Sequence, residues 1–100
     1  MTTGRELSKE GIILMTAAGW KPIWNGNYRA PLPAGLSNLP DHAFVRDNVL
    51  LMAEVKGGRD KLRKGQEEFM NDILDLENPN VHYFIIESMA DWEEAANVRC

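Results

Sequence analysis

Two short apolar runs, separated by two residues that favour tight turns, limit the folds open to this chain more than any other feature. Residues 41–46 and 49–56 both have the composition of β-strands, and Asp47-Asn48 stands between them. Asn and Asp tolerate the left-handed backbone that a two-residue hairpin turn requires. We therefore expect an antiparallel hairpin over residues 41–56.

The register of this hairpin aligns two acidic residues. A two-residue turn pairs Arg46 with Val49. Counting outward from that couple brings Asp41 opposite Glu54, where opposed Cβ atoms are about 4.5–5.5 Å apart. Lys56 points to the same face, because side chains alternate along a strand. Adjacent carboxylates repel each other unless a cation lies between them, and Mg²⁺ prefers oxygen ligands, so the hairpin predicts a metal site.

A glutamine on the following helix adds a polar group to this site. The helix is expected over residues 62–74, and Gln66 shares one apolar stripe with Phe69, Met70 and Ile73. Gln66 is the member of the stripe closest to the helix start. We therefore expect its side chain to lie near the end of the strand that carries the acid and the lysine.

A helix near the N-terminus offers a further carboxylate. Glu10 shares a stripe with apolar residues and lies at the border of the buried face, while Glu6 lies one turn earlier. Thr3 and Glu6 have the form of a capping box, which gives Glu6 a structural role. The pattern therefore slightly favours Glu10 over Glu6 as the additional ligand.

The whole chain alternates helix and strand patterns. A parallel pair joined through a helix and an antiparallel hairpin together predict a mixed sheet with helices on its faces. The expected fold class is α/β, in the order α-β-β-β-α-β-α. Outside the hairpin and the helix at 62–74, the expected elements are a helix at 5–19, strands at 20–24 and 81–87, a long loop at 25–40 and a helix at 89–98.

Length and composition indicate one small domain over residues 1–100. The net charge of −4 does not by itself indicate nucleic-acid binding. No run approaches the ~20 apolar residues that span a bilayer, and the N-terminus lacks the layout of a signal peptide. The only cysteine is Cys100, so no internal disulfide can form. We expect a cytoplasmic protein without a membrane partner.

The arrangement of these residues resembles the PD-(D/E)xK nuclease superfamily. The motif stands here as "PD" at Pro40-Asp41 and as "EVK" at residues 54–56, with Gln66 at the start of the next helix. The continuation "EVKGGRDKLRKGQ", residues 54–66, is particularly similar to the virus-type replication-repair nuclease (VRR-NUC) domains. The resemblance covers most of the chain and implies a restriction-endonuclease-like sheet.

The resemblance also implies a site and its chemistry. Asp41, Glu54 and the Val55 carbonyl would bind Mg²⁺, for which Mn²⁺ can substitute, with Glu10 as the first-helix ligand. Lys56 would orient the attacking water or help to deprotonate it. Gln66, the fourth predicted catalytic residue beside Asp41, Glu54 and Lys56, would steady the site.

The implied activity is structure-selective cleavage of DNA. Stand-alone relatives form homodimers and act on branched DNA such as Holliday junctions, in bacteria or in phage-infected host cells. Phosphates of such a substrate need basic partners beyond the acidic centre. The sequence supplies these candidates: Arg29, Arg59, Lys61, Arg63 and Lys64.

Other interpretations of the same residues exist. Glu54 and Lys56 could form an ordinary surface ion pair, and the basic residues a solvated helix start. A non-catalytic DNA-binding or assembly module could keep the fold, and a restriction-like system could use such a nuclease subunit. The three tryptophans, like His42 and His82, are expected to be structural rather than part of the site.

Overall fold

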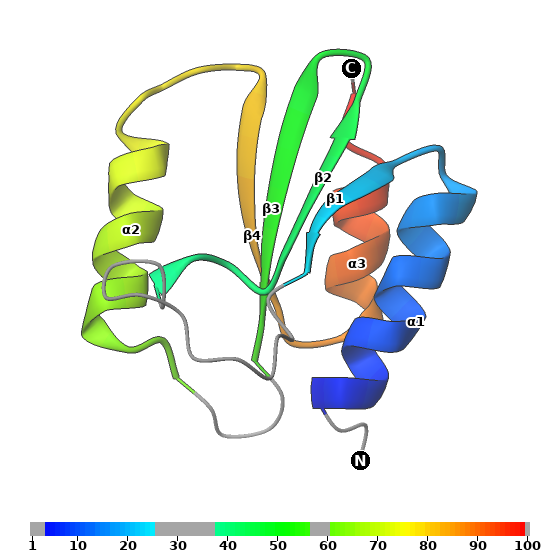
Figure 1. Ribbon diagram of the computed structural model, residues 1–100, viewed down its shortest axis with the longest axis horizontal. Helices are drawn as coiled ribbons and strands as arrows, with labels where there is room; N and C mark the ends of the chain where they lie inside the picture. The colour runs from blue at the N-terminus through cyan, green and yellow to red at the C-terminus, as the bar shows by residue number, and fades with distance from the viewer. Residues whose placement is uncertain (1–3, 26–37, 57–60, 100) are drawn as a thin grey trace.

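The computed structural model describes residues 4–25, 38–56 and 61–99. It is an α/β fold in which a four-stranded mixed sheet lies between helices, in the predicted order α-β-β-β-α-β-α (Figure 1). None of the helices in these ranges is long and apolar enough to cross a bilayer. The elements are α1 (Gly4–Ala17), β1 (Lys21–Asn25), β2 (His42–Arg46), β3 (Val49–Val55), α2 (Lys64–Leu74), β4 (Val81–Ile86) and α3 (Met89–Ala96).

The strands follow the order β1-β2-β3-β4 across the sheet. The pairs β1–β2 and β2–β3 are antiparallel, and β4 runs parallel to β3, as expected for a strand–helix–strand unit. Helix α2 lies over one face, and α1 and α3 lie together over the other (Figure 1). The apolar run at 81–86 forms β4, which is an edge strand, and α2 and α3 contact it from the two sides of the sheet.

The hairpin of β2 and β3 has the predicted register. Asp47 and Asn48 adopt φ values of 47° and 67°, which is the left-handed pair of a two-residue turn. Arg46 pairs with Val49, and the ladder continues without interruption to His42 and Ala53. The couple that would follow is Asp41 and Glu54, so the hairpin positions both acids at the far end from its turn.

The main core lies between the sheet and the pair α1–α3. Trp92 of α3 is fully buried, and its indole N–H donates to the Leu7 carbonyl of α1 at 3.0 Å. The Trp92 ring meets Phe44 of β2 edge-on, with ring centroids 6.0 Å apart. Trp20 is also buried and donates to the Ala96 carbonyl at 3.2 Å. Aromatic burial on this face holds the back of the hairpin rigid.

Arg46 joins the hairpin to the ends of both covering helices. Its guanidinium donates to the carbonyl of Ala18, just after α1, at 2.7 Å, and to that of Val98, just after α3, at 2.6 Å. The same group lies 4.4 Å from the centre of a Trp20 ring. Arg46 thus satisfies carbonyls that helix ends leave without intrahelical partners.

Helix ends agree with the sequence patterns in part. The chain leaves α1 through Gly19, whose φ of 91° only glycine adopts without strain. Ser88 is the N-cap of α3, as expected, and the Asp91 carboxylate accepts from the Ser88 N–H at 3.1 Å. Helix α2 begins at Lys64, later than the predicted residue 62. Thr3, the other half of the predicted capping box, lies outside the described residues.

Candidate functional site

The two acids at the end of the hairpin are held side by side by backbone hydrogen bonds. The Asp41 N–H donates to Oε2 of Glu54 at 3.2 Å, and the Val55 N–H donates to Oδ2 of Asp41 at 2.9 Å. Asp41 is half-buried, and only 2 % of the Glu54 side chain is exposed. The carboxylates therefore replace the next rung of the β2–β3 ladder and face each other across it.

Gln66 connects this acid pair to α2. Its Nε2 donates to Oε1 of Glu54 at 3.0 Å, while its Oε1 accepts from Lys56 Nζ at 3.1 Å and from the Arg63 N–H at 2.9 Å. Every polar atom of the buried amide has a partner, and these partners define its orientation. Gln66 is thus both the glutamine that caps the first turn of α2 and a direct contact of the acid pair.

Lys56 completes a connected cluster of four side chains. Its Nζ lies 3.5 Å from Oε1 of Glu54, and the two side chains are 15 % and 2 % exposed. This burial excludes the interpretation of Glu54 and Lys56 as an ordinary surface ion pair. Buried charges cost several kcal/mol unless hydrogen bonds and opposite charges compensate them, which is what the cluster provides.

The charge balance of the cluster favours binding of an additional positive charge. Burial and, after it, the neighbouring Asp41 carboxylate raise the pKa of Glu54 to about 7, against the opposing effect of Lys56. A single lysine therefore does not neutralise the two acids. A proton or a cation at this place relieves the repulsion between the carboxylates.

The donor set fits a hard divalent cation. Asp41 and Glu54 present carboxylate oxygens, and the Val55 carbonyl points toward β2 because its N–H already reaches Asp41 on that side. Mg²⁺ is commonly held by one or two carboxylates and completes its coordination with water and substrate phosphates. The three predicted ligands thus match what this ion requires.

The predicted first-helix ligand lies apart from this pair. Glu10 is exposed on α1, whose buried face consists of other residues. Across residues 4–25, 38–56 and 61–99, no third acidic, histidine or cysteine side chain joins Asp41 and Glu54 in a group that could hold a metal. Glu10 as an additional ligand therefore stays a prediction, and Glu6 is likewise exposed on α1.

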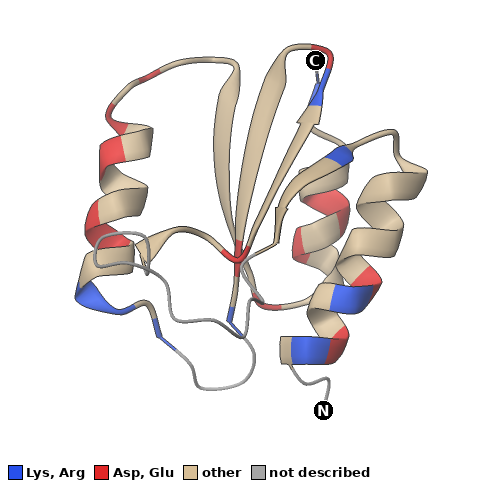
Figure 2. Ribbon diagram, viewed as in Figure 1, with Lys and Arg blue, Asp and Glu red and all other residues tan. Residues whose placement is uncertain are grey.

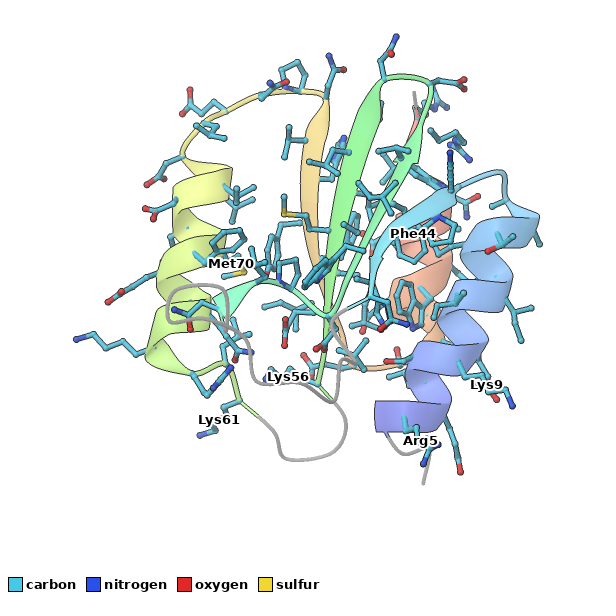
Figure 3. All side chains as sticks on the ribbon, in the orientation of Figure 1. Arg5, Lys9, Phe44, Lys56, Lys61 and Met70 are labelled. Carbon is cyan, nitrogen blue, oxygen red and sulfur yellow. The ribbon has the colours of Figure 1, made fainter. Side chains whose placement is uncertain are left out.

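Basic residues lie at the end of the molecule that carries the site. Lys61, Arg63 and Lys64 are exposed at the start of α2 and just before it. Figure 2 shows these positive positions at the same end as the close of β3, while the rest of α2 is mostly acidic or neutral. Figure 3 shows Lys56 and Lys61 at that end. Arg29 and Arg59, the other predicted phosphate contacts, lie outside the described residues.

Two features near the site were not predicted from the sequence. The indole N–H of Trp24 donates to the Pro40 carbonyl at 2.8 Å, which fixes the chain directly before Asp41. On the other side, Tyr83 of β4 has a buried hydroxyl without a hydrogen-bond partner among the described residues. Each depends on how segments far apart in the sequence lie in the fold, so no local sequence pattern could have indicated them.

His42 lies behind the acid pair rather than in it. It is 1 % exposed and packs between Phe44 and Trp92, with ring centroids 6.2 and 5.9 Å away. Burial lowers the pKa of His42, against an opposing effect of Asp41, so the ring is neutral at physiological pH. The expectation that this histidine is structural is consistent with its surroundings.

Comparisons with known proteins give no relative for this chain. No protein-family model, curated protein or solved structure matches it. The class of site is therefore defined by its own chemistry: two adjacent carboxylates, one buried lysine and one bridging glutamine beside a basic helix start.

Proposed function

We propose that this protein is a metal-dependent endonuclease that hydrolyses phosphodiester bonds in DNA, with a VRR-NUC-like domain of the PD-(D/E)xK superfamily. The observation that supports this proposal best is the hydrogen-bonded cluster of Asp41, Glu54, Lys56 and Gln66. An ordinary structural ion pair needs neither a second carboxylate beside it nor a bridging amide.

Each residue has a distinct part in the proposed reaction. Asp41, Glu54 and the Val55 carbonyl hold Mg²⁺ or Mn²⁺. Such a cation supplies an activated water and neutralises charge that develops on the phosphate. Lys56 Nζ, which points into the cluster, would orient the attacking water or, as the neutral amine, would help to deprotonate it. Gln66 fixes the lysine and Glu54 relative to each other.

The charge distribution on α2 supports a phosphate-bearing substrate. A helix N-terminus favours negative charge, yet basic residues flank the start of α2 at Lys61, Arg63 and Lys64. This arrangement costs helix stability unless an anion binds there. A DNA phosphate would meet the positive end of the helix dipole and the basic side chains together.

Branched DNA and a homodimer belong to the same proposal. Two copies related by a twofold axis present two cutting sites, which matches the symmetry of a four-way junction. Strand β4 is at an edge of the sheet and its sequence, VHYFII, contains no acidic or basic side chain other than one histidine. Uncharged edge strands readily pair with another chain.

A cleavage assay tests the proposed activity. Four-way junction, flap and linear duplex DNA are incubated with the protein in Mg²⁺ and in EDTA. We expect Mg²⁺-dependent cleavage, strongest on branched DNA, and a loss of at least about 100-fold for Lys56→Ala, the range typical of removing a proton-transfer group. The control is Lys9→Ala, an exposed lysine on α1, which should cleave at the wild-type rate.

The outcome separates the candidate functions. Cleavage that persists in EDTA would contradict a metal-dependent nuclease. Tight binding of junction DNA without cleavage in Mg²⁺ or Mn²⁺ would favour the non-catalytic DNA-binding module. Neither binding nor cleavage of any of the three DNAs would remove DNA as the substrate.

A further inference from the structure

The hydroxyl of Tyr83 is a buried polar group without a partner in the part of the chain that the structure describes. Among the residues that the structure describes, its oxygen has no hydrogen-bond partner and is closed off from solvent. An unpaired buried hydroxyl costs about 1–3 kcal/mol. Phenylalanine would fill the same space without that cost, so the hydroxyl needs an explanation beyond packing.

Tyr83 lies on the face of the sheet that carries the site. In the parallel register of β3 and β4, Tyr83 pairs with Met52 and Ile85 pairs with Glu54. Side chains of such couples share a face, and residues two apart along a strand point the same way. Tyr83 is therefore a diagonal neighbour of Glu54 beneath α2.

The tyrosine ring packs against α2, close enough to the acid pair for the charges there to act on it. Its centroid lies 6.4 Å from that of Phe69 on α2. Burial raises the pKa of Tyr83 well above its usual range, and the carboxylates of Glu54 and Asp41 raise it further. Both acids thus act on the hydroxyl, which stays protonated at neutral pH and can both donate and accept a hydrogen bond.

We propose that Tyr83 is a positioning residue of the metal site, whose hydroxyl hydrogen-bonds to a water held by the cation at Asp41 and Glu54. This inference rests on the proposed metal binding. Mg²⁺ keeps several waters when only one or two carboxylates bind it, and these waters donate hydrogen bonds to acceptors around them. Among the described residues, the Tyr83 oxygen is a buried polar atom on this face without a hydrogen-bond partner.

The substitution Tyr83→Phe removes the hydroxyl and little else. Binding of Mn²⁺ is measured by electron paramagnetic resonance, and unfolding by urea is measured in EDTA. We expect the Mn²⁺ dissociation constant to rise about 5- to 10-fold, the size of one hydrogen bond. In EDTA the variant should be as stable as the wild type or more stable, because an unpaired hydroxyl is gone. A purely structural tyrosine would show the opposite pair of results.

Two further measurements make the test specific. The control Phe69→Leu disturbs the same ring contact without changing a polar group, and should lower stability in EDTA while leaving the Mn²⁺ affinity within about twofold. With tyrosine labelled by ¹³C at Cζ, the Tyr83 signal, assigned by its absence in Tyr83→Phe, should shift on addition of Mg²⁺. A signal that does not move while the protein binds the ion would overturn the inference.

The failures of the two proposals are distinguishable. If the wild type binds neither Mn²⁺ nor Mg²⁺, the proposed metal centre is wrong and the inference falls with it. If the wild type binds the ion and Tyr83→Phe binds it equally well, only the role of Tyr83 is refuted.

Discussion

Glu54 accepts from the Asp41 N–H and from Gln66 Nε2, and it pairs with Lys56, while 2 % of its side chain is exposed. These partners lower the cost of its charge without removing it, because burial and the facing Asp41 carboxylate raise its pKa to about 7. The folded protein without metal therefore binds a proton at Glu54 more tightly than the unfolded chain does. Stability then depends on pH through Glu54 as one of the titrating groups.

The sign of that dependence follows from the direction of the shift. For an acid with a raised pKa, the contribution to stability is complete below the ordinary value of 4.5 and is lost as pH rises through 7. We expect the metal-free protein to lose about 3 kcal/mol from this source between pH 4.5 and pH 7.5. Glu54→Gln, which cannot titrate, should lack this loss. Urea unfolding of both proteins in EDTA measures the difference.

A matched comparison isolates Glu54 from the other titrating groups. Burial lowers the pKa of His42, so the contribution of this residue to stability is lost as pH falls. That loss has the opposite pH dependence and occurs in both proteins. Saturating Mg²⁺ should flatten the wild-type profile, since a cation replaces the proton between the carboxylates. Parallel pH profiles for the wild type and Glu54→Gln would show that Glu54 does not titrate in this window.

At the scale of single residues, local patterns predicted part of the site. The two-residue turn fixed which residue opposes Glu54, strand alternation placed Lys56, and the helical stripe placed Gln66. Tyr83 could not be predicted in this way, because the register of a parallel pair joined through a helix is set by packing rather than by a turn. The helical pattern likewise placed Glu10 at the border of the apolar face of the first helix, but it could not show which other elements pack near that residue.

At the scale of elements, α1 and α3 pack closely because α1 has a glycine where α3 has a tryptophan. A Cβ atom at Gly11 would overlap the indole ring of Trp92. That ring cannot easily yield, since it is fully buried, donates to the Leu7 carbonyl and packs against Phe44. The sequence pattern indicated both helices, but the need for glycine at this contact is visible only once α3 lies on α1.

The substitution Gly11→Ala therefore has two opposing effects on stability. Alanine favours a helix interior over glycine by about 1 kcal/mol, while overpacking of a rigid core costs about 1–3 kcal/mol. Because the overlap involves a held indole, we expect a net loss of stability of about 1–2 kcal/mol in urea unfolding. Gly4→Ala is the matched control: nothing lies near a Cβ there, so it should be neutral or slightly stabilising. Equal effects of both substitutions would contradict this account of the α1–α3 contact.

At the scale of the whole molecule, the two edges of the sheet differ in their readiness to pair with another chain. Strand β1 has Pro22, which lacks an N–H, and its register with β2 shifts between Pro22 and Trp24. Both features disfavour the addition of a strand. Strand β4 has no proline and no shift in register. The backbone carbonyls of Asn80 and Ile86 accept hydrogen bonds from β3 and its end. Residues of β4 at odd positions, such as Tyr83 and Ile85, therefore direct their backbone N–H and C=O groups away from β3, toward the open edge. The sequence predicted the hairpin and the parallel pair, while the pairing of β1 with β2, which leaves β4 at the other edge, is seen only in the structure.

If β4 is the dimer edge, a charge there should separate the copies. The proposed homodimer joins β4 to β4 of a second copy, antiparallel about a twofold axis, and so extends the mixed sheet across both copies. Val81→Lys introduces a charge at the half-buried start of β4, a device by which edge strands resist pairing. We expect light scattering after gel filtration to give a dimer mass for the wild type at micromolar concentration and a monomer mass for the variant.

Ile23→Lys makes the same change on the opposite edge, where the side chain is 53 % exposed, and should stay dimeric. A wild-type monomer would leave paired cutting of a junction without support. Dissociation of Ile23→Lys alone would place the interface at β1. Unchanged circular dichroism spectra of both variants would show that a change in mass reports on pairing and not on unfolding.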